Sequence, residues 1–237
     1  MRLHRVLEGE GPPLLLSSSL GTTHRLWDTN VGALARRFRV VRYDHPGHGG
    51  SPPGPRTIEG LARAALSLLD ELGLERVAFC GLSLGGMVGM WLGAHAPERL
   101  DRLVLACTAP RLPPAEQWLE RAETVRREGM EAIADAVLAR WFTPGFAGDR
   151  APWRAMLVST PPEGYARCCE AIAAADLRAE LRAVRVPLTV ILGRHDPVIG
   201  DEARRLLAEA GPVVELDAAH LANVEQPEAF AEAVLAA

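Results

Sequence analysis

The amino-acid sequence predicts an α/β fold with a mainly parallel central sheet flanked by helices. Short apolar runs bounded by Gly, Pro or Asp recur along the chain. Several of them are continuous rather than alternating, as in strands that are covered on both faces. Segments with apolar residues at helical spacing separate these runs, and such alternation of strands and helices indicates a parallel sheet.

Each element is justified by its own pattern. The predicted strands are residues 14–16, 39–43, 77–80, 103–106, 188–192 and 213–216. A helix is predicted between Thr57, a favourable N-terminal cap, and Gly73, a favourable C-terminal stop. Further helices are predicted over 86–96 and 201–210, and from Pro227 onward, where proline suits the first turn.

The alternation stops between about residues 111 and 182. This stretch has helical patterns without a convincing strand, and it contains three of the five tryptophans. We therefore expect a helical cap over 111–182, inserted into a core formed by 1–110 and 183–237. Apolar pockets with a few polar groups form at such junctions.

The composition argues against several classes of partner and mechanism. A formal net charge of −4 gives no reason to expect a nucleic acid or an anionic membrane as partner. No apolar run approaches the ~20 residues of a membrane span, and the first residues do not resemble a signal peptide. The four cysteines lack zinc-ligand spacing, so we expect a cytoplasmic protein with free thiols. The chain contains no lysine, which excludes a catalytic lysine.

The most informative motif is Gly81-Leu82-Ser83-Leu84-Gly85. A Gly-x-Ser-x-Gly motif between a strand and a helix is typical of a nucleophile elbow, in which the tight turn requires small flanking residues. The Ser83 hydroxyl then lies at a helix N-terminus, which favours developing negative charge. A serine between glycines can also be a simple turn, but the flanking strand and helix favour the elbow.

A serine nucleophile needs a base, and the base needs an orienting carboxylate. In elbow enzymes the three groups follow in the order Ser, Asp or Glu, His, after successive strands. Asp196 follows the strand 188–192 and His220 follows the strand 213–216. Each of these residues alone could be an ordinary loop residue. Together with Ser83 they predict a catalytic triad at the carboxyl edge of the sheet, where ligands bind in open α/β sheets.

An acyl-transfer enzyme must also stabilise an oxyanion. We expect one donor to be the backbone N–H of Leu84, directly after the nucleophile, and the other to be the N–H of Leu20, after the first strand. The loop 44–51 contains His45 and His48. The sequence offers no cysteine or further ligand cluster beside these two histidines, so a tight turn beside the site is favoured over a metal site.

These motifs resemble those of the α/β-hydrolase superfamily, and the motifs in the predicted cap are similar to those of the 3-oxoadipate enol-lactonase family. The similar stretches are 17–22, 38–44, 81–89, 96–99, 140–144, 160–165 and 219–227. One position departs from the pattern, because Pro46 stands where an arginine is expected.

The resemblance implies a serine hydrolase that opens the lactone ring of 3-oxoadipate enol-lactone without a metal or organic cofactor. Its small substrate carries a carboxylate, for which Arg140 is the candidate ligand, with Trp141 and Tyr165 as further substrate contacts. Alternatives remain: a carboxylesterase, a cofactor-free perhydrolase, a carbon–carbon bond hydrolase, or a non-catalytic binding protein that reuses the pocket. The oligomeric state stays open.

Overall fold

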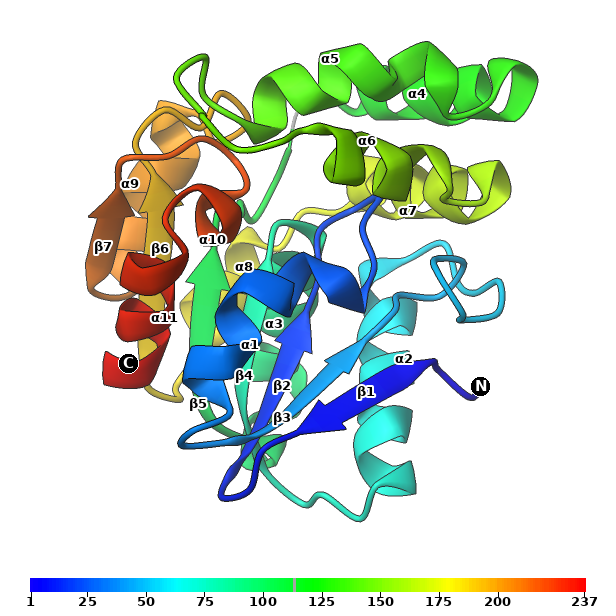
Figure 1. Cartoon of the computed structure of the whole chain (residues 1–237). Coiled ribbons are helices and arrows are strands. Elements are labelled where there is room, and N and C mark those ends of the chain that lie inside the picture. Colours follow the sequence, from blue (N-terminus) through cyan, green and yellow to red (C-terminus); the bar gives the residue numbers. More distant parts are fainter. Residues whose placement is uncertain (113) are drawn as a thin grey trace.

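A seven-stranded sheet forms the centre of the molecule in the computed structural model, which describes residues 1–112 and 114–237 (Figure 1). The strand order is β1-β3-β2-β4-β5-β6-β7. β1 runs antiparallel to β3, and every other neighbouring pair is parallel. The strands are β1 Arg5–Glu8, β2 Pro13–Ser17, β3 Arg39–Tyr43, β4 Val77–Leu82, β5 Leu100–Ala106, β6 Leu188–Gly193 and β7 Val213–Leu216. The predicted α/β fold with a mainly parallel sheet is confirmed.

One strand, β1, is not predicted by the apolar pattern of the sequence. This strand has four residues, two of them charged, and it pairs only with β3 at the edge of the sheet. Its side chains are half-buried or exposed, so it lacks the apolar run that marks the other strands. A continuous apolar run is needed only where both faces of a strand are buried, and the faces of β1 are not.

Helices cover both faces of the sheet (Figure 1). α1 packs against α11 on one face, whereas α2, α3, α8 and α9 form a row of neighbours on the other. The helices of these two layers are α1 Asp28–Leu34, α2 Ile58–Glu71, α3 Leu84–His95, α8 Arg178–Ala183, α9 Asp201–Ala210, α10 Ala222–Glu225 and α11 Pro227–Ala236, with short 3-10 turns η1 His24–Trp27 and η2 Pro97–Arg99. None of the helices within residues 1–112 and 114–237 combines the length and apolar character needed to cross a membrane.

Helix α3 is buried from Leu84 to Gly93 because it lies between the sheet and its helical neighbours. Its glycines allow this close approach. A Cβ added to Gly86 would lie 2.5 Å from Thr108, and one added to Gly93 would lie 3.0 Å from Val184, beside α8. Both glycines therefore let α3 pack closely against its neighbours.

Four further helices lie across the carboxyl ends of the strands (Figure 1). They are α4 Ala115–Glu128, α5 Glu131–Trp141, α6 Ala151–Val158 and α7 Pro162–Ala174, and we refer to them as the cap helices. α8 Arg178–Ala183 lies at the end of the expected insertion 111–182 but packs against α3 and α9 instead. The division into a core and a cap remains a proposal, and these contacts favour ending the cap at α7.

The packing of α3 leads to a prediction about stability. Gly86→Ala should lower the free energy of unfolding by about 1–3 kcal/mol, because the new methyl group has no room beside Thr108. Gly145→Ala is the matched control, since a Cβ there meets nothing within 4 Å. Its effect should stay within about 0.5 kcal/mol. Urea unfolding followed by circular dichroism measures both, and equal values for the two variants would contradict the prediction.

Candidate active site

Ser83 occupies the turn between β4 and α3 with φ 57° and ψ −113°. A positive φ is strained for a residue with a side chain and costs on the order of 1–3 kcal/mol. Three hydrogen bonds hold this conformation. The Ser83 N–H donates to the Ala106 carbonyl at 2.9 Å, and the Ser83 carbonyl accepts from Met87 N–H at 3.1 Å and from the Thr108 hydroxyl at 2.7 Å. The turn is the one that the Gly-x-Ser-x-Gly motif predicts.

The two motif glycines occupy positions where a side chain would not fit. A Cβ on Gly81 would lie 2.2 Å from the Gly85 carbonyl oxygen, and a Cβ on Gly85 would lie 2.1 Å from the Ser17 carbonyl oxygen. Both contacts are with backbone, which cannot move aside as a flexible side chain can. The elbow therefore excludes any larger residue at these positions.

The structure brings Ser83, His220 and Asp196 together. His220 Nε2 lies 2.9 Å from Ser83 Oγ, and His220 Nδ1 lies 2.8 Å from Asp196 Oδ2. The carboxylate accepts, so Nδ1 carries the proton and Nε2 is left to accept the serine hydroxyl proton. The Val198 N–H donates to the other Asp196 oxygen at 2.9 Å. All three side chains are buried, which strengthens their electrostatic coupling.

Asp196 and His220 follow two neighbouring strands. β6 and β7 are parallel and adjacent, so the loops that follow them emerge side by side. A Cβ on Gly193 would lie 2.2 Å from the Ala219 carbonyl, which shows how closely the two loops cross. The His195 N–H donates to the Ala218 carbonyl at 3.0 Å and ties them together. The His195 side chain points to solvent and pairs with Asp217 at 2.8 Å, so it stays outside the cluster.

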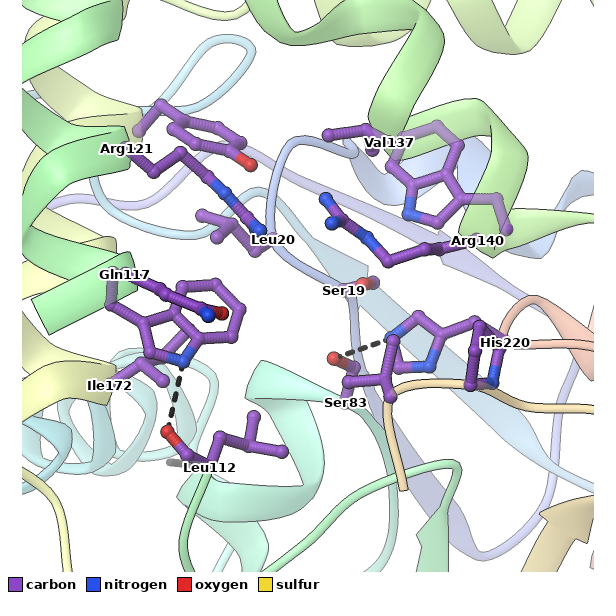
Figure 2. A pocket seen from close by; sticks show the side chains of 15 residues that line it. Ser19, Leu20, Ser83, Leu112, Gln117, Arg121, Val137, Arg140, Ile172 and His220 are labelled. Atoms are coloured by element: carbon purple, nitrogen blue, oxygen red, sulfur yellow. Dashed lines mark hydrogen bonds between the residues drawn. The ribbon is translucent and has the colours of Figure 1, made fainter. Parts of the chain in front are cut away.

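A cavity of about 250 Å³ opens in front of Ser83 and His220 (Figure 2). It lies between the carboxyl edge of the sheet and the cap helices. Its lining residues are Ser19, Leu20, Ser83, Leu112, Gln117, Trp118, Arg121, Val137, Arg140, Trp141, Tyr165, Ile172, Pro197, Val198 and His220. The volume lies below the range of about 300–1,000 Å³ for drug-sized ligands, so the cavity suits a small molecule.

Two guanidinium groups face this cavity, from Arg121 on α4 and Arg140 on α5 (Figure 2). Within residues 1–112 and 114–237 neither group has a carboxylate within ion-pair distance. Burial and the positive charge of Arg121 lower the pKa of Arg140. The Arg121 guanidinium lies 4.5 Å from the Trp118 ring centroid. Two partly buried cations without an anion make a place where a ligand carboxylate is favoured.

All three predicted substrate contacts, Arg140, Trp141 and Tyr165, line the cavity. Arg121 and its neighbours Gln117 and Trp118 also line the cavity, although no sequence motif marks them as substrate contacts. The signal was present: these residues follow one another at a spacing that puts them on one face of a helix, inside the expected insertion. Which face turns inward could not be read from the spacing.

The chain matches the family model described as the alpha/beta hydrolase family over residues 14–233. The protein belongs to this family. It is 39% identical to 3-oxoadipate enol-lactonase 2 of Acinetobacter baylyi over 236 residues, which cover 96% of this chain and 88% of the relative. The crystal structure of the enol-lactonase from Burkholderia xenovorans LB400 superimposes with a TM-score of 0.94 at 45% identity, covering 99% of this chain and 95% of that one. A thermophilic esterase from Thermogutta terrifontis, described as malate bound, gives a TM-score of 0.90 at 30% identity, covering 99% and 92%.

In this α/β hydrolase one expected oxyanion donor, Leu20, lines the same cavity, and the other, Leu84, directly follows the cavity-lining Ser83. Leu84 begins α3 directly after Ser83, and Leu20 lies in the loop that follows β2. Among the described residues neither N–H donates to another protein group. The Gly85 N–H donates to the Ser18 carbonyl at 3.1 Å, which holds the loop against the start of α3. Two free N–H groups beside a serine hydroxyl are what an oxyanion hole requires.

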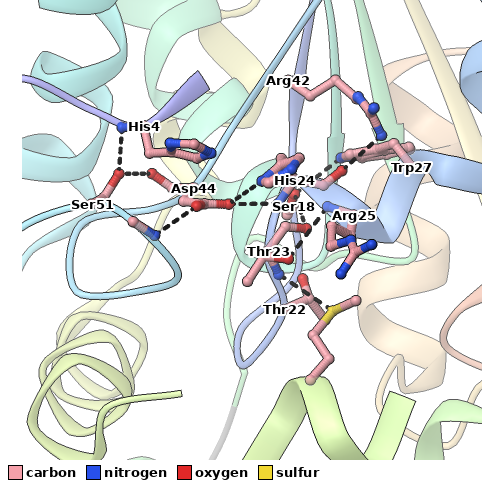
Figure 3. Close-up of polar contacts among 12 residues, drawn as sticks. His4, Ser18, Thr22, Thr23, His24, Arg25, Trp27, Arg42, Asp44 and Ser51 are labelled. Carbon is pink, nitrogen blue, oxygen red and sulfur yellow. Dashed lines mark hydrogen bonds and ion pairs between the residues drawn. The ribbon is translucent and has the colours of Figure 1, made fainter. Parts of the chain in front are cut away.

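The loop 44–51 is hydrogen-bonded to the segment that follows Leu20, and Asp44 points toward His24 (Figure 3). Asp44 Oδ1 accepts from the His24 backbone N–H at 2.6 Å, and Asp44 Oδ2 accepts from Gly50 N–H at 2.9 Å. His48 Nε2 accepts from the Gly21 N–H at 3.1 Å, one residue after Leu20. Because Nε2 accepts, His48 is neutral here, and burial lowers its pKa to about 4. The His48 N–H donates to the His45 carbonyl and the Ser51 N–H to the His48 carbonyl, so this loop makes tight turns beside the site.

The burial of His48 gives the α/β hydrolase a pH-dependent stability. The unfolded chain binds a proton at this residue below pH ~6.5, whereas the folded chain does so only near pH 4, so stability falls as the pH drops through this window. Between pH 7 and 4.5 the wild type should lose about 2 kcal/mol more than His48→Gln, whose amide oxygen can still accept from Gly21.

Urea unfolding at the two pH values measures this difference. His195→Gln, at an exposed histidine, is the control and should follow the wild type. Parallel losses in the wild type and His48→Gln would refute the role of His48.

Proposed function

We propose that this α/β hydrolase opens the lactone ring of 3-oxoadipate enol-lactone and releases 3-oxoadipate, the activity for which its Acinetobacter relative is named. One observation carries the proposal. The hydrogen-bonded Ser83, His220 and Asp196 face a small cavity that also holds two guanidinium groups without a protein carboxylate. A small ester that bears its own carboxylate fits both features.

In the first half of the reaction Ser83 Oγ attacks the lactone carbonyl while His220 Nε2 takes the hydroxyl proton. Asp196 keeps the imidazole in the required tautomer and stabilises its charged form. The carbonyl oxygen becomes an oxyanion, for which the N–H groups of Leu20 and Leu84 are the proposed donors. The buried setting makes these interactions stronger than they would be in water.

In the second half the ring C–O bond breaks, and His220 returns its proton to the departing enol oxygen. The enol then becomes a ketone, which makes ring opening hard to reverse. Water, deprotonated by His220, attacks the acyl-enzyme and regenerates the Ser83 hydroxyl. No step needs a metal or an organic cofactor.

The substrate carboxylate is proposed to bind Arg140 and Arg121. An arginine fork matches the two oxygens of a carboxylate, and burial of the guanidinium increases the gain from pairing. Trp141 and Tyr165 are proposed as the walls beside the lactone ring. The esterase from Thermogutta terrifontis, which resembles this chain, was solved with malate, a dicarboxylate, and this supports an anionic ligand.

The cysteines support a proposed cytoplasmic location. Cys80, Cys107, Cys168 and Cys169 are all free and buried. Burial raises the pKa of each thiol, so none is poised as a thiolate. Buried neutral thiols act as small apolar side chains and leave the chemistry to Ser83.

Ser83→Ala should reduce enol-lactone hydrolysis by about 10⁴-fold or more, because the nucleophile is absent. The measurement is the loss of enol-lactone absorbance, with thermal unfolding as the control for an intact fold. An alkyl fluorophosphonate should label the wild type at Ser83 and leave the variant unlabelled. Full activity of a folded Ser83→Ala protein would end the proposal.

Arg140→Gln and Arg121→Gln should each lower kcat/KM for the enol-lactone by roughly tenfold to a hundredfold, because a charged hydrogen bond to the substrate is lost. A neutral ester such as 4-nitrophenyl acetate should be hydrolysed at an unchanged rate. Arg154→Gln, at an arginine on α6 that pairs with Glu131, is the control. Equal losses on the charged and neutral substrates would contradict carboxylate recognition.

A further inference from the structure

The stretch 219–227 contains polar side chains that have no role in the proposed reaction. His220 has its proposed role, but the short helix α10 that follows carries Asn223 and Glu225. Asn223 is fully buried and Glu225 is half-buried. The Asn223 side chain binds the core and the Glu225 side chain binds the segment after α5, so together they connect the His220 loop to the cap helices.

Glu225 joins the end of α5 to the residue before the base. One of its carboxylate oxygens, Oε1, accepts from the Thr143 N–H at 2.9 Å and from the Thr143 hydroxyl at 2.7 Å. The other, Oε2, accepts from the Ala219 N–H at 2.5 Å. Three donors converge on one carboxylate, and hydrogen bonds to an ionised acceptor are the strong ones. Thr143 lies two residues beyond α5, and Ala219 directly precedes His220.

The backbone makes a parallel connection. The His220 N–H approaches the Arg140 carbonyl at 3.4 Å, and the Leu221 N–H donates to the Trp141 carbonyl at 3.0 Å. The last carbonyls of a helix have no partner within the helix, so these contacts satisfy two of them. The turn of α5 that carries Arg140 and the loop that carries His220 are therefore joined at two levels.

Asn223 anchors the same loop to the core. Its Nδ2 donates to the Leu26 carbonyl at 2.9 Å and to Asn30 Oδ1 at 3.0 Å, and Asn30 donates back to the Asn223 carbonyl at 3.0 Å. Asn223 thus fixes the loop to the core, and Glu225 on the same loop fixes the end of α5 through Thr143.

We propose that Glu225 is a positioning residue that sets the Arg140 guanidinium at a fixed place relative to the His220 imidazole. An ester whose carboxylate binds Arg140 then has its carbonyl held against Ser83. The inference rests on the proposed function only in taking Ser83 and His220 as the ester-cleaving groups and Arg140 as a carboxylate ligand. It does not depend on the lactone being the natural substrate.

Two test esters separate positioning from stability. Mono-4-nitrophenyl adipate keeps the six-carbon chain of the proposed product, with four carbons between the carbonyl and the carboxylate, and its methyl ester is the neutral counterpart. The quantity of interest is the ratio of kcat/KM for the acid to kcat/KM for the methyl ester, after subtraction of uncatalysed hydrolysis. A purely structural residue changes both rates together and leaves this ratio unchanged.

Glu225→Gln is the informative variant, because the amide has the same shape but presents an NH₂ group to one of the N–H donors. The ratio should fall about tenfold, since a small misplacement of a binding group is costly. In the Arg140→Gln background the same change should leave the ratio unaltered, because the coupled group is already absent. Glu131→Gln, at the other end of α5, is the matched control and should keep the wild-type ratio.

Thr143→Val removes a single donor to Glu225 and keeps the carboxylate, so it should lower the ratio in the same direction by a smaller factor. It serves if Glu225→Gln does not fold. An unchanged ratio in Glu225→Gln, an equal fall in the Arg140→Gln background, or no effect of Arg140→Gln itself would each overturn the proposal. Hydrolysis of both esters without hydrolysis of the enol-lactone would overturn the proposed substrate alone.

Discussion

The geometry of the site depends on the strained backbone of Ser83. A serine with positive φ persists only where its surroundings leave no alternative. Here β4 is buried along its whole length, and α3 is buried from its first residue. Relaxing the turn would require moving elements that carry much of the core. The hydroxyl is therefore presented by the core itself rather than by a mobile loop, and this rigidity gives His220 a fixed partner.

Much of the core could be predicted because its signals are local. Buried strands appear as continuous apolar runs, and the elbow requires small residues at defined positions. The cluster of Ser83, Asp196 and His220 followed from topology, since parallel strands bring their carboxyl ends to one edge of the sheet. β1 escaped prediction because an edge strand with charged residues has no such run. Arg121 escaped because the inward face of α4 is decided by contacts with α7 that lie far away in sequence.

The two parts of the cavity have different physical characters. The sheet edge contributes a rigid set of donors and acceptors whose positions follow from strand pairing. The cap helices contribute arginines and aromatic rings on segments that the sheet does not hold directly. A small anionic substrate needs both parts in register, because a carboxylate held in the wrong place would hold the reacting carbonyl in the wrong place as well.

The contact between Thr143 and Glu225 has a consequence for how such enzymes diversify. Recombination that exchanges the cap helices of one hydrolase for those of another would leave the elbow and the loops that carry Asp196 and His220 in place. The exchange would still remove the Thr143 donors to the Glu225 carboxylate, unless the incoming segment supplies a donor of its own. Thr143, just after α5, and Glu225, about eighty residues downstream, therefore have to be inherited together.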